Sequence, residues 1–431
     1  MVEVAGYFTN LTRGFRELGV ECTFFSGPDD FRYYHEAARR NDNLAMRWIK
    51  LAWRKQCDLS RWNIPLKAWW IGVGQLFRLL LFAKAALRHD AFIFTSPTGF
   101  FTFWNWDLRV LKLLGKKVIF VFTGSDHRPP YINGVYAGEE QGSGAAELVR
   151  RARDMKARLK KIERYADYTV GHHLSAHFHQ KPIAILQLLG VPPPAHDRRM
   201  VQLPDRNRGP LRLLHAPSRP KVKGSDAIRA AVRNLKMKGY DLELIELIGM
   251  PNSEVLKELS HCDFVVDELY SDTRLAGLST EAATFDKPTI VGGYAEDGYF
   301  GVPGVLEKED FPPILYCAPD KIEEAMEKFI TDEACRSELG ERAKRFVEER
   351  WTPVEVARRY LRLIEGTAPA SWFYDPSRIR YLHGYGLSEA RLKTVLRGVL
   401  KQGGTGALQL SDKPELERLF LEFAQEGAGP A

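Results

Sequence analysis

The sequence LRLLHAPSRPKVKGSD, residues 211–226, joins two different hydrophobic patterns. It begins with an apolar run typical of a buried strand and leads into a pattern typical of an amphipathic helix. Between the two lie Arg219, Lys221 and Lys223, followed by Gly224. The N–H groups and the dipole at a helix N-terminus attract anions. This strand-loop-helix unit is therefore predicted to bind a diphosphate, with a merely basic loop as the alternative.

The same alternation of short strand-like runs and helical patterns continues along the chain in both directions. The strand-like runs are AFIF at 91–94, KVIFVF at 117–122 and YTVG at 168–171 in the first half, and LELIELIG at 242–249, CDFVVDEL at 262–269, KPTIVGG at 287–293 and ILYCA at 314–318 in the second. Strands that alternate with helices form parallel sheets covered by helices on both faces. The sequence therefore predicts an α/β protein with two Rossmann-like, doubly wound domains.

A proline-rich polar segment, VPPPAHDRRMVQLPDRNRGP at 191–210, separates the two series of strands. It lacks hydrophobic periodicity and is predicted to be an exposed connection. The expected organisation is a first domain at 1–192, a linker at 193–210, a second domain at 211–366 and a helical C-terminal extension at 367–431. The extension contains helical patterns at 388–402 and 413–425, and no residue in it suggests chemistry.

The composition is that of a folded protein from a reducing compartment. The 431 residues are 45% apolar and 27% charged, and the five scattered cysteines form neither a zinc pattern nor a disulfide framework. The N-terminus lacks the pattern of a secretory signal, so the cytoplasm is the expected compartment. Charge is uneven, because residues 1–190 hold 28 Lys and Arg against 17 Asp and Glu, whereas the whole chain carries +7.

Two segments of this basic half raise the question of membrane contact. The run RRARDMKARLKKIER at 150–164 fits either a solvated helix face or a patch for anionic lipid or a phosphate-bearing acceptor. No recognition motif that would indicate nucleic acid accompanies it. The apolar segment from Trp69 to Leu87 contains glycines and charged residues that disfavour a membrane span. Core packing and contact with a membrane surface are its two interpretations.

A second group of polar residues lies in DELYSDTRLAGLSTE, residues 267–281. Glu281 is expected early in a helix whose N-terminus faces the same rim of the sheet as the basic loop. A carboxylate there can accept hydrogen bonds from ribose hydroxyls, while the backbone from Gly277 to Ser279 approaches a phosphate. A glutamate that only stabilises its own helix is the alternative, and the neighbouring basic loop favours the ligand.

The order of these elements resembles the retaining GT-B glycosyltransferases, the group that contains sucrose, polysaccharide and mannosyl-lipid synthases. The resemblance covers residues 1–365 loosely and residues 211–292 most specifically. The basic loop that ends at Lys223 and Gly224 looks like the family's arginine and lysine that hold the donor diphosphate.

The paired-glutamate motif of the family is half present. Glu281 with Lys287-Pro288 is similar to its second half, the glutamate that grips the ribose. Thr273 stands where the family has the first glutamate, and Glu268 or Asp272 could substitute for it. The resemblance implies donor contacts from Ser218, Gly224, Gly249, Glu268, Thr273, Gly277, Leu278, Ser279 and Glu281.

In the first domain, the strand at 117–122 leads into TGSDHR, residues 123–128, which resembles the family's His-Gly-Ser-Asp-x-Arg segment with a threonine in place of the histidine. The alternative is a local turn with an ion pair. The candidate catalytic residues are Asp126, His127, Arg219 and Lys223. The acceptor-side candidates are Gly6, Tyr7, Gly124, Ser125 and Arg128.

The resemblance implies transfer of a sugar, with retention, from a UDP- or GDP-linked donor to a glycan, a lipid-linked saccharide or a small glycoside. It implies neither a metal nor a further cofactor, because the leaving diphosphate accepts the proton and positive side chains stabilise it. The expected location is the cytoplasm, including the inner face of the membrane, where the basic first domain would make peripheral contact. Two other interpretations stay open: a sugar-nucleotide 2-epimerase with the same fold, and a binding protein that has lost turnover.

Overall fold

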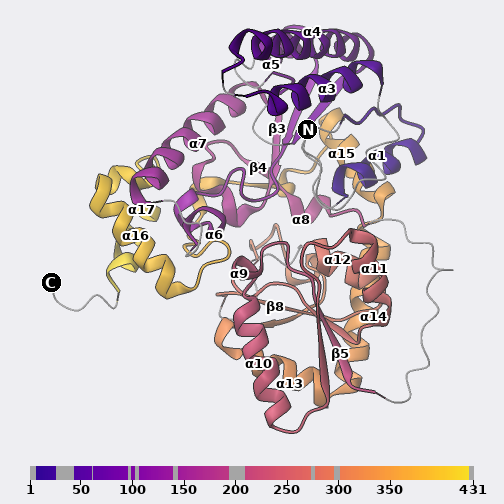
Figure 1. Cartoon of the computed structure of the whole chain (residues 1–431), viewed down its shortest axis with the longest axis vertical. Helices are drawn as coiled ribbons and strands as arrows, with labels where there is room; N and C mark the ends of the chain where they lie inside the picture. Colours follow the sequence, from indigo (N-terminus) through magenta and orange to yellow (C-terminus); the bar gives the residue numbers. More distant parts are fainter. Residues whose placement is uncertain are drawn as a thin grey trace.

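The structure is a computed structural model of the chain, and it describes residues 6–25, 43–60, 62–95, 99–101, 106–138, 144–193, 209–272, 277–295 and 301–426. Two domains lie one above the other along the long axis of the molecule (Figure 1), and each contains a five-stranded sheet. The prediction of an α/β protein with two domains, each built on a largely parallel sheet, is confirmed. Most of the expected linker and all of Met1 to Val4 lie outside the described residues.

The first sheet has the strand order β1-β2-β3-β4-β10. Its strands are β1 (Ala91–Thr95), β2 (Lys117–Val121), β3 (Tyr168–Gly171), β4 (Ile183–Ile185) and β10 (Phe373–Tyr374). The first four are parallel, with Ile93 opposite Ile119 and Val170 opposite Ala184, whereas β10 pairs antiparallel with β4. Strand β2 is buried from Val118 onward, because it has neighbouring strands on both sides and helices over both faces.

Helices surround this first sheet. They are α1 (Tyr7–Glu17), α3 (Leu44–Asp58), α4 (Ile64–Arg88), α5 (Trp106–Leu113), α6 (Gly134–Ala137), α7 (Ala145–Tyr165) and α8 (Leu186–Leu189), with the short 3-10 helices η1 (Pro130–Ile132) and η2 (His173–Phe178). Helix α7 buries Leu148, Met155 and Leu159, while Arg150 and Arg153 of its basic run are exposed. The basic run at 150–164 therefore supplies a solvated face of an amphipathic helix.

The second sheet is wholly parallel and has the order β6-β5-β7-β8-β9. Its strands are β5 (Leu211–His215), β6 (Leu242–Glu246), β7 (Phe264–Val266), β8 (Thr289–Gly292) and β9 (Leu315–Cys317). Around it lie α9 (Pro220–Lys223), α10 (Ser225–Met237), α11 (Asn252–His261), α12 (Gly277–Thr284), α13 (Ile322–Thr331) and α14 (Glu333–Arg350), with η4 (Lys308–Asp310) and η5 (Pro319–Lys321). The order reverses beside β5, so the loops after β5 and β7 lie at a switch point, the usual ligand position in such sheets.

Helix α15 (Pro353–Glu365) returns the chain to the first domain. The Thr352 side chain caps its N-terminus by accepting a hydrogen bond from the Glu355 N–H, and Pro353 occupies its first turn. The hydroxyl of Tyr360 lies 3.0 Å from the hydroxyl of Tyr7 in α1. This places α15 on the first domain, although it follows the second domain in the chain.

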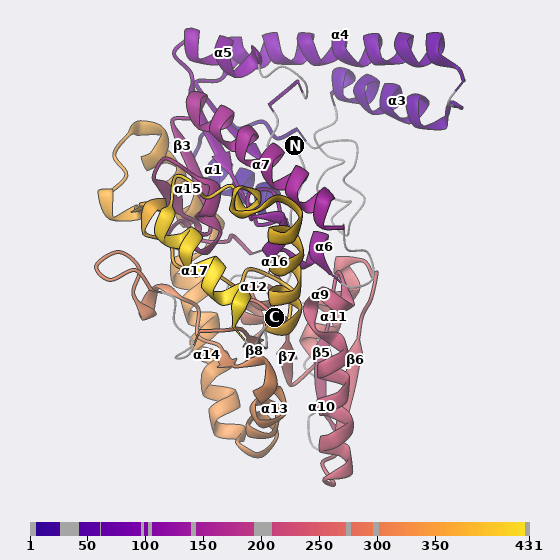
Figure 2. The same cartoon turned by 90° about the vertical axis from the view of Figure 1, so that its left-hand side faces the viewer.

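The C-terminal extension also packs on the first domain. It comprises η6 (Ala370–Trp372), β10, η7 (Pro376–Arg378), α16 (Glu389–Gly403), η8 (Thr405–Leu408) and α17 (Pro414–Gln425). Leu396 of α16 and Phe420 of α17 belong to the same apolar cluster as Phe120 of β2. In Figure 2 these two helices lie beside α7, so the extension completes the first domain in space.

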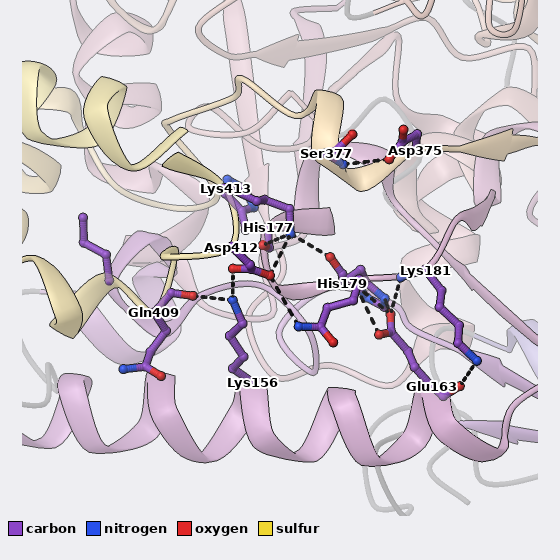
Figure 3. Close-up of polar contacts among 12 residues, drawn as sticks. Lys156, Glu163, His177, His179, Lys181, Asp375, Ser377, Gln409, Asp412 and Lys413 are labelled. Carbon is purple, nitrogen blue, oxygen red and sulfur yellow. Dashed lines mark hydrogen bonds and ion pairs between the residues drawn. The ribbon is translucent and has the colours of Figure 1, made fainter. Parts of the chain in front are cut away.

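Polar contacts around Lys413 fasten the extension to the first domain (Figure 3). The buried Lys413 ammonium donates hydrogen bonds of 2.7 Å to the carbonyl oxygens of both His177 and His179. Burial lowers the pKa of Lys413 to about 8. Beside it, Lys156 of α7 pairs with Asp412 and also donates a 2.6 Å hydrogen bond to the carbonyl of Gln409. These contacts join residues more than 230 positions apart.

Helix α4 is the most apolar helix on the surface of the described chain. Its 25 residues are long and apolar enough to cross a membrane by length and composition, with a mean hydropathy of 1.4 over its best 18-residue window, and 28% of that window is buried in the protein. The segment that was expected to pack or to touch a membrane surface is thus a continuous helix, and Gly72 and Gly74 do not interrupt it.

Candidate functional site

Lys223 lies at the carboxyl end of the second sheet, where the chain passes from β5 through α9 into α10. Its ammonium donates a 3.0 Å hydrogen bond to Asp267 and a further one to Glu268, and only 11% of the lysine side chain is exposed. Burial lowers the pKa of Lys223, but the two carboxylates outweigh burial and hold the pKa well above its ordinary value. The lysine is therefore a permanently charged group at this edge of the sheet.

The two carboxylates that hold Lys223 differ in their surroundings. Asp267 accepts hydrogen bonds of 3.1 Å and 2.7 Å from the N–H and hydroxyl of Ser279, so the start of α12 fixes it. Glu268 is 2% exposed, and burial raises its pKa against the lowering effect of Lys223. Its Oε1 atom has no hydrogen-bond partner among the described residues. Glu268 is thus the carboxylate with capacity left for a ligand.

Glu281 lies in α12, at the same edge of the second sheet as Lys223, and is buried. Its carboxylate accepts a 3.0 Å hydrogen bond from the side-chain amide of Asn252, the first residue of α11. The helices that follow β6 and β7, the strands on either side of β5, therefore meet at Glu281, and its carboxylate is held in one orientation. Sequence reasoning had not singled out Asn252.

The 123–128 loop follows β2 in the first domain. Asp126 accepts hydrogen bonds from the N–H groups of Thr123, at 3.2 Å, and Gly124, at 2.9 Å. Burial raises the pKa of Asp126, and these backbone hydrogen bonds oppose that rise. Gly124 adopts φ 144°, which a side chain would strain. Asp126 therefore closes a local turn, and this turn orients the following Arg128.

Arg128 is buried and projects toward the C-terminal extension. Its guanidinium lies 5.0 Å from the centre of the Tyr385 ring. The Lys223 ammonium lies 5.9 Å from the same centre. The Nε atom of Arg128 has no hydrogen-bond partner among the described residues, and burial lowers its pKa. The structure thus brings one predicted residue from each domain to the same aromatic ring.

Tyr385 belongs to a short segment, residues 381–387, that we call the strap. The strap runs between the two domains: the Tyr385 N–H donates to the Ile132 carbonyl at 3.1 Å, and the Gly386 N–H donates to the Tyr270 carbonyl at 2.7 Å. A Cβ atom on Gly384 would overlap the Ile132 carbonyl, and Gly384 has φ +93°. Only glycine fits there, because the backbones approach so closely.

Asp272 anchors the start of the strap in the second domain. It accepts hydrogen bonds from the hydroxyls of Tyr381 and Tyr316 and from the Tyr294 N–H at 2.9 Å. Tyr294 also stacks on His383, with ring centres 4.2 Å apart. Asp272, one of the two substitutes considered for the missing first glutamate, is therefore used to hold the strap.

His127 lies behind this junction and is fully buried. Its Nδ1 is 3.0 Å from Nε2 of His179, whose Nδ1 is 2.8 Å from a carboxylate oxygen of Glu163. Burial and the neighbouring His179 hold the pKa of His127 well below its ordinary value, so the ring is neutral. Its Nε2 has no partner among the described residues. Figure 3 shows Glu163 and His179 of this chain of contacts.

The remaining predicted site residues are placed less centrally. Ser218 and Arg219 are exposed just before α9, and Gly249 adopts φ +71° in an open loop after β6. Tyr7 is buried, with its hydroxyl 3.2 Å from the carbonyl of Gly190, and Gly6 caps α1 in a left-handed conformation. Gly224 caps the C-terminus of α9 with φ +81°. Gly277 and Leu278 are the first two residues of α12. Ser125 is half-buried, and Thr273 lies outside the described residues.

The residues that sequence reasoning missed are those of the strap. The segment YLHGYGL, residues 381–387, contains two glycines and two tyrosines, but it follows the last predicted α/β unit and shows no motif. Only the tertiary structure, in which the chain folds back, shows that the strap lies between the two domains. Among the described residues, no group of three or more His, Cys, Asp or Glu side chains is arranged to hold a metal ion.

No protein-family model and no curated protein matches the chain. Several solved structures are similar. The glycosyltransferase SnogD from Streptomyces nogalater is 15% identical, with 83% of this chain and 95% of that chain covered and a TM-score of 0.40. The glycosyltransferase of kitacinnamycin is 12% identical, with 85% and 96% covered and a TM-score of 0.42. Anabaena Alr3699/HepE in complex with UDP is 11% identical, with 68% and 84% covered and a TM-score of 0.38.

Proposed function

We propose that this protein is a GT-B glycosyltransferase that binds the diphosphate of a nucleotide-sugar at the junction between its two domains. The observation that carries the proposal is a pair of buried polar atoms at this junction, Nε of Arg128 and Oε1 of Glu268, which have no hydrogen-bond partner among the described residues. Buried polar atoms are nearly always hydrogen bonded, so this pair indicates a polar ligand. The ligand would include negative charge, because Arg128 and Lys223 face the same ring.

The residues of the second domain would hold the donor. Lys223 and Arg219, at the entry to α10, would carry the charge of the diphosphate, and the helix N-terminus would add N–H donors. Glu281, held by Asn252, would accept hydrogen bonds from the ribose hydroxyls. Oε1 of Glu268, which has no hydrogen-bond partner among the residues that the structure describes, would accept a hydrogen bond from a hydroxyl of the transferred sugar, the role that the resemblance gives to the missing first glutamate.

The proposed reaction is transfer with retention and without a metal. The acceptor hydroxyl oxygen bonds to the anomeric carbon as the bond from that carbon to the diphosphate oxygen breaks, and the hydroxyl proton passes to the departing diphosphate. Positive charge from Lys223 and Arg219 would stabilise the leaving group in a water-poor site. The proposed donor is UDP- or GDP-linked. The proposed acceptor is a glycan, a lipid-linked saccharide or a small glycoside, reached from the cytoplasm.

Calorimetric titration of the protein with UDP, GDP, ADP and TDP tests the binding part of this proposal. One nucleotide class should bind, and Arg128→Ala should weaken that binding. The matched control is Arg153→Ala on the exposed face of α7. Absence of binding by every nucleotide to the folded protein would contradict the proposal.

Donor consumption then separates the function from its alternatives. Release of the nucleotide that depends on an added acceptor indicates the transferase. Rearrangement of the donor without an acceptor indicates the 2-epimerase, and binding without either indicates a protein that has lost turnover.

A further inference from the structure

The hairpin formed by α3 and α4 carries most of the exposed large apolar side chains of the described residues. In Figure 2, α4 is a long straight helix at one end of the molecule, and α3 runs back alongside it. Trp62 in the turn is 89% exposed, and Trp69 in α4 is 66% exposed. Exposed apolar side chains continue along the same face of α4 at Leu76, Leu80 and Leu87, which follow Trp69 at successive spacings of seven, four and seven residues. Contiguous apolar patches of this kind mark interaction surfaces.

The inward face of α4 is apolar as well. Phe82 and Ala85 join the apolar cluster of the first domain, and Leu81 packs in a smaller cluster with Met46 of α3. A surface helix in a globular protein normally turns a polar face outward. Because α4 is apolar on both faces and still lies at the surface, its outward face requires a second apolar environment.

Positive charge accompanies this apolar face. Helices α3 and α4 together contain eight Lys and Arg residues, and Asp58 is their only acidic residue. Arg47, Arg54 and Lys55 of α3 are exposed, as are Lys84 and Arg88 at the end of α4. Basic residues beside exposed tryptophan and leucine are the pattern of helices that lie in the interface of an anionic bilayer.

We propose that the α3–α4 hairpin docks this protein onto an anionic phospholipid bilayer, with α4 lying parallel to the membrane. The outward side chains of α4 enter the boundary between head groups and acyl chains, and the basic side chains lie at the level of the lipid phosphates. A neutral or wholly polar partner would not account for the excess of basic over acidic side chains on these two helices. The inference deepens the proposed function, since a docked enzyme would meet a lipid-linked acceptor at this surface.

The contacts of α4 favour surface docking over a membrane span. Phe82, Ala85 and Ala86 are buried in the core of the first domain, so a spanning α4 would pull them out of that core. The rings of Trp48 and Phe77 stack at 5.4 Å and hold α3 against α4. A span would also break this stacking contact, whereas docking keeps both the packing of α4 in the core and its contact with α3.

Co-sedimentation of the full chain with lipid vesicles tests the inference. Vesicles of phosphatidylcholine with phosphatidylglycerol should bind the protein, vesicles of phosphatidylcholine alone should bind it far less, and high salt should release it. Replacing Trp69, Leu76 and Leu80 together by serine should reduce partitioning at least tenfold. Arg54→Ser and Lys55→Ser should each reduce it about fivefold, the effect of one basic residue near an anionic surface.

The matched control replaces Met237, Ile248 and Met250, exposed apolar residues of the second domain, by serine and should bind vesicles as the parent does. Equal binding to neutral and anionic vesicles, or none to either, would overturn the proposal. A dimer in solution that the Trp69, Leu76 and Leu80 substitutions dissociate would show that a second copy covers this face instead. Retention in cell membranes after alkaline extraction would show a span. Vesicle binding requires no donor, so it succeeds or fails independently of the proposed transfer reaction.

Discussion

The guanidinium of Arg128 lies 5.0 Å from the centre of the Tyr385 ring, and the Lys223 ammonium lies 5.9 Å from the same point. One aromatic side chain of the C-terminal extension thus contacts a cation from each domain. Lys223 is one of the cations proposed to bind the donor diphosphate, and Arg128 is the cation of the first domain whose removal is predicted to weaken nucleotide binding. We therefore expect the Tyr385 ring and the donor to compete for these two side chains.

Removal of the Tyr385 ring should strengthen nucleotide binding. Tyr385→Ala frees the space beside Lys223 and Arg128, so the affinity for UDP or GDP, measured by calorimetry, is expected to rise several-fold. Tyr385→Phe keeps the ring and should bind the nucleotide as the parent does. Weaker binding by Tyr385→Ala would instead show that the ring forms part of the donor site.

Lys223→Ala should have two separate effects. It removes a charge-assisted contact to the diphosphate, which weakens nucleotide binding by about 1.5–3 kcal/mol. It also leaves Asp267 and Glu268 buried without their cation, which lowers the free energy of unfolding by about 3–5 kcal/mol. Lys221→Ala, at an exposed position of the same helix, should change stability by less than about 0.5 kcal/mol. An unchanged nucleotide affinity in Lys223→Ala would contradict the diphosphate assignment.

Glu281→Gln should separate ribose binding from diphosphate binding. The amide keeps the shape of the side chain but loses the charge, so the affinity for a nucleoside diphosphate should fall about tenfold. The affinity for inorganic pyrophosphate, which has no ribose, should stay the same. Equal losses for both ligands would show that Glu281 supports the site as a whole and does not contact the ribose.

Gly384→Ala should detach the strap. Gly384 has φ +93°, and its added Cβ would meet the Ile132 carbonyl, so the substitution is expected to cost about 1–3 kcal/mol and to expose the strap to proteases. Limited proteolysis with chymotrypsin measures the exposure of the strap as the rate of cleavage after Tyr381 and Tyr385. Gly406→Ala, where an added Cβ meets open space, is the control. Equal cleavage rates in the two variants would mean that the strap is not held by this contact.

Acid should destabilise the protein through its buried histidines. Burial lowers the pKa of both His172 and His177 to about 3, whereas an unfolded chain has a histidine pKa near 6.5. Between these values the unfolded chain binds protons that the native protein does not. The stability from these groups is therefore complete above about pH 6.5 and is lost as the pH falls toward 3, by about 1.4 kcal/mol per pH unit for each group.

Urea unfolding at several pH values measures this loss. His177→Gln should reduce the slope below pH 6.5. A midpoint that is constant from pH 7 to pH 5 would contradict the burial of neutral histidines.

Much of the architecture could be predicted from the sequence, because strands and helices are local patterns. The run at 117–122 and the apolar run that begins at Leu211 formed β2 and β5 nearly as expected. The helical patterns at 388–402 and 413–425 became α16 and α17, shifted by one residue at most. Side-chain periodicity depends on neighbours a few positions away, so it can be read without knowledge of distant contacts.

The candidate site was predicted only in part. Lys223 and Arg128 were identified from local motifs, but their common partner Tyr385 lies in an extension that shows no motif. Asp272 binds Tyr381, which lies 109 positions further along the chain, and Glu163 contacts His179, which lies 16 positions further. Local motifs do not contain either contact.

The order of strand and helix, and the positions where charged loops follow strands, were thus set by the sequence, because they depend on hydrophobic periodicity and on glycine and proline. The tertiary structure alone established that the C-terminal extension folds back onto the first domain and passes through the junction. It alone also showed that α4 turns an apolar face outward. These features arise from packing between segments far apart in the chain, which no local pattern contains.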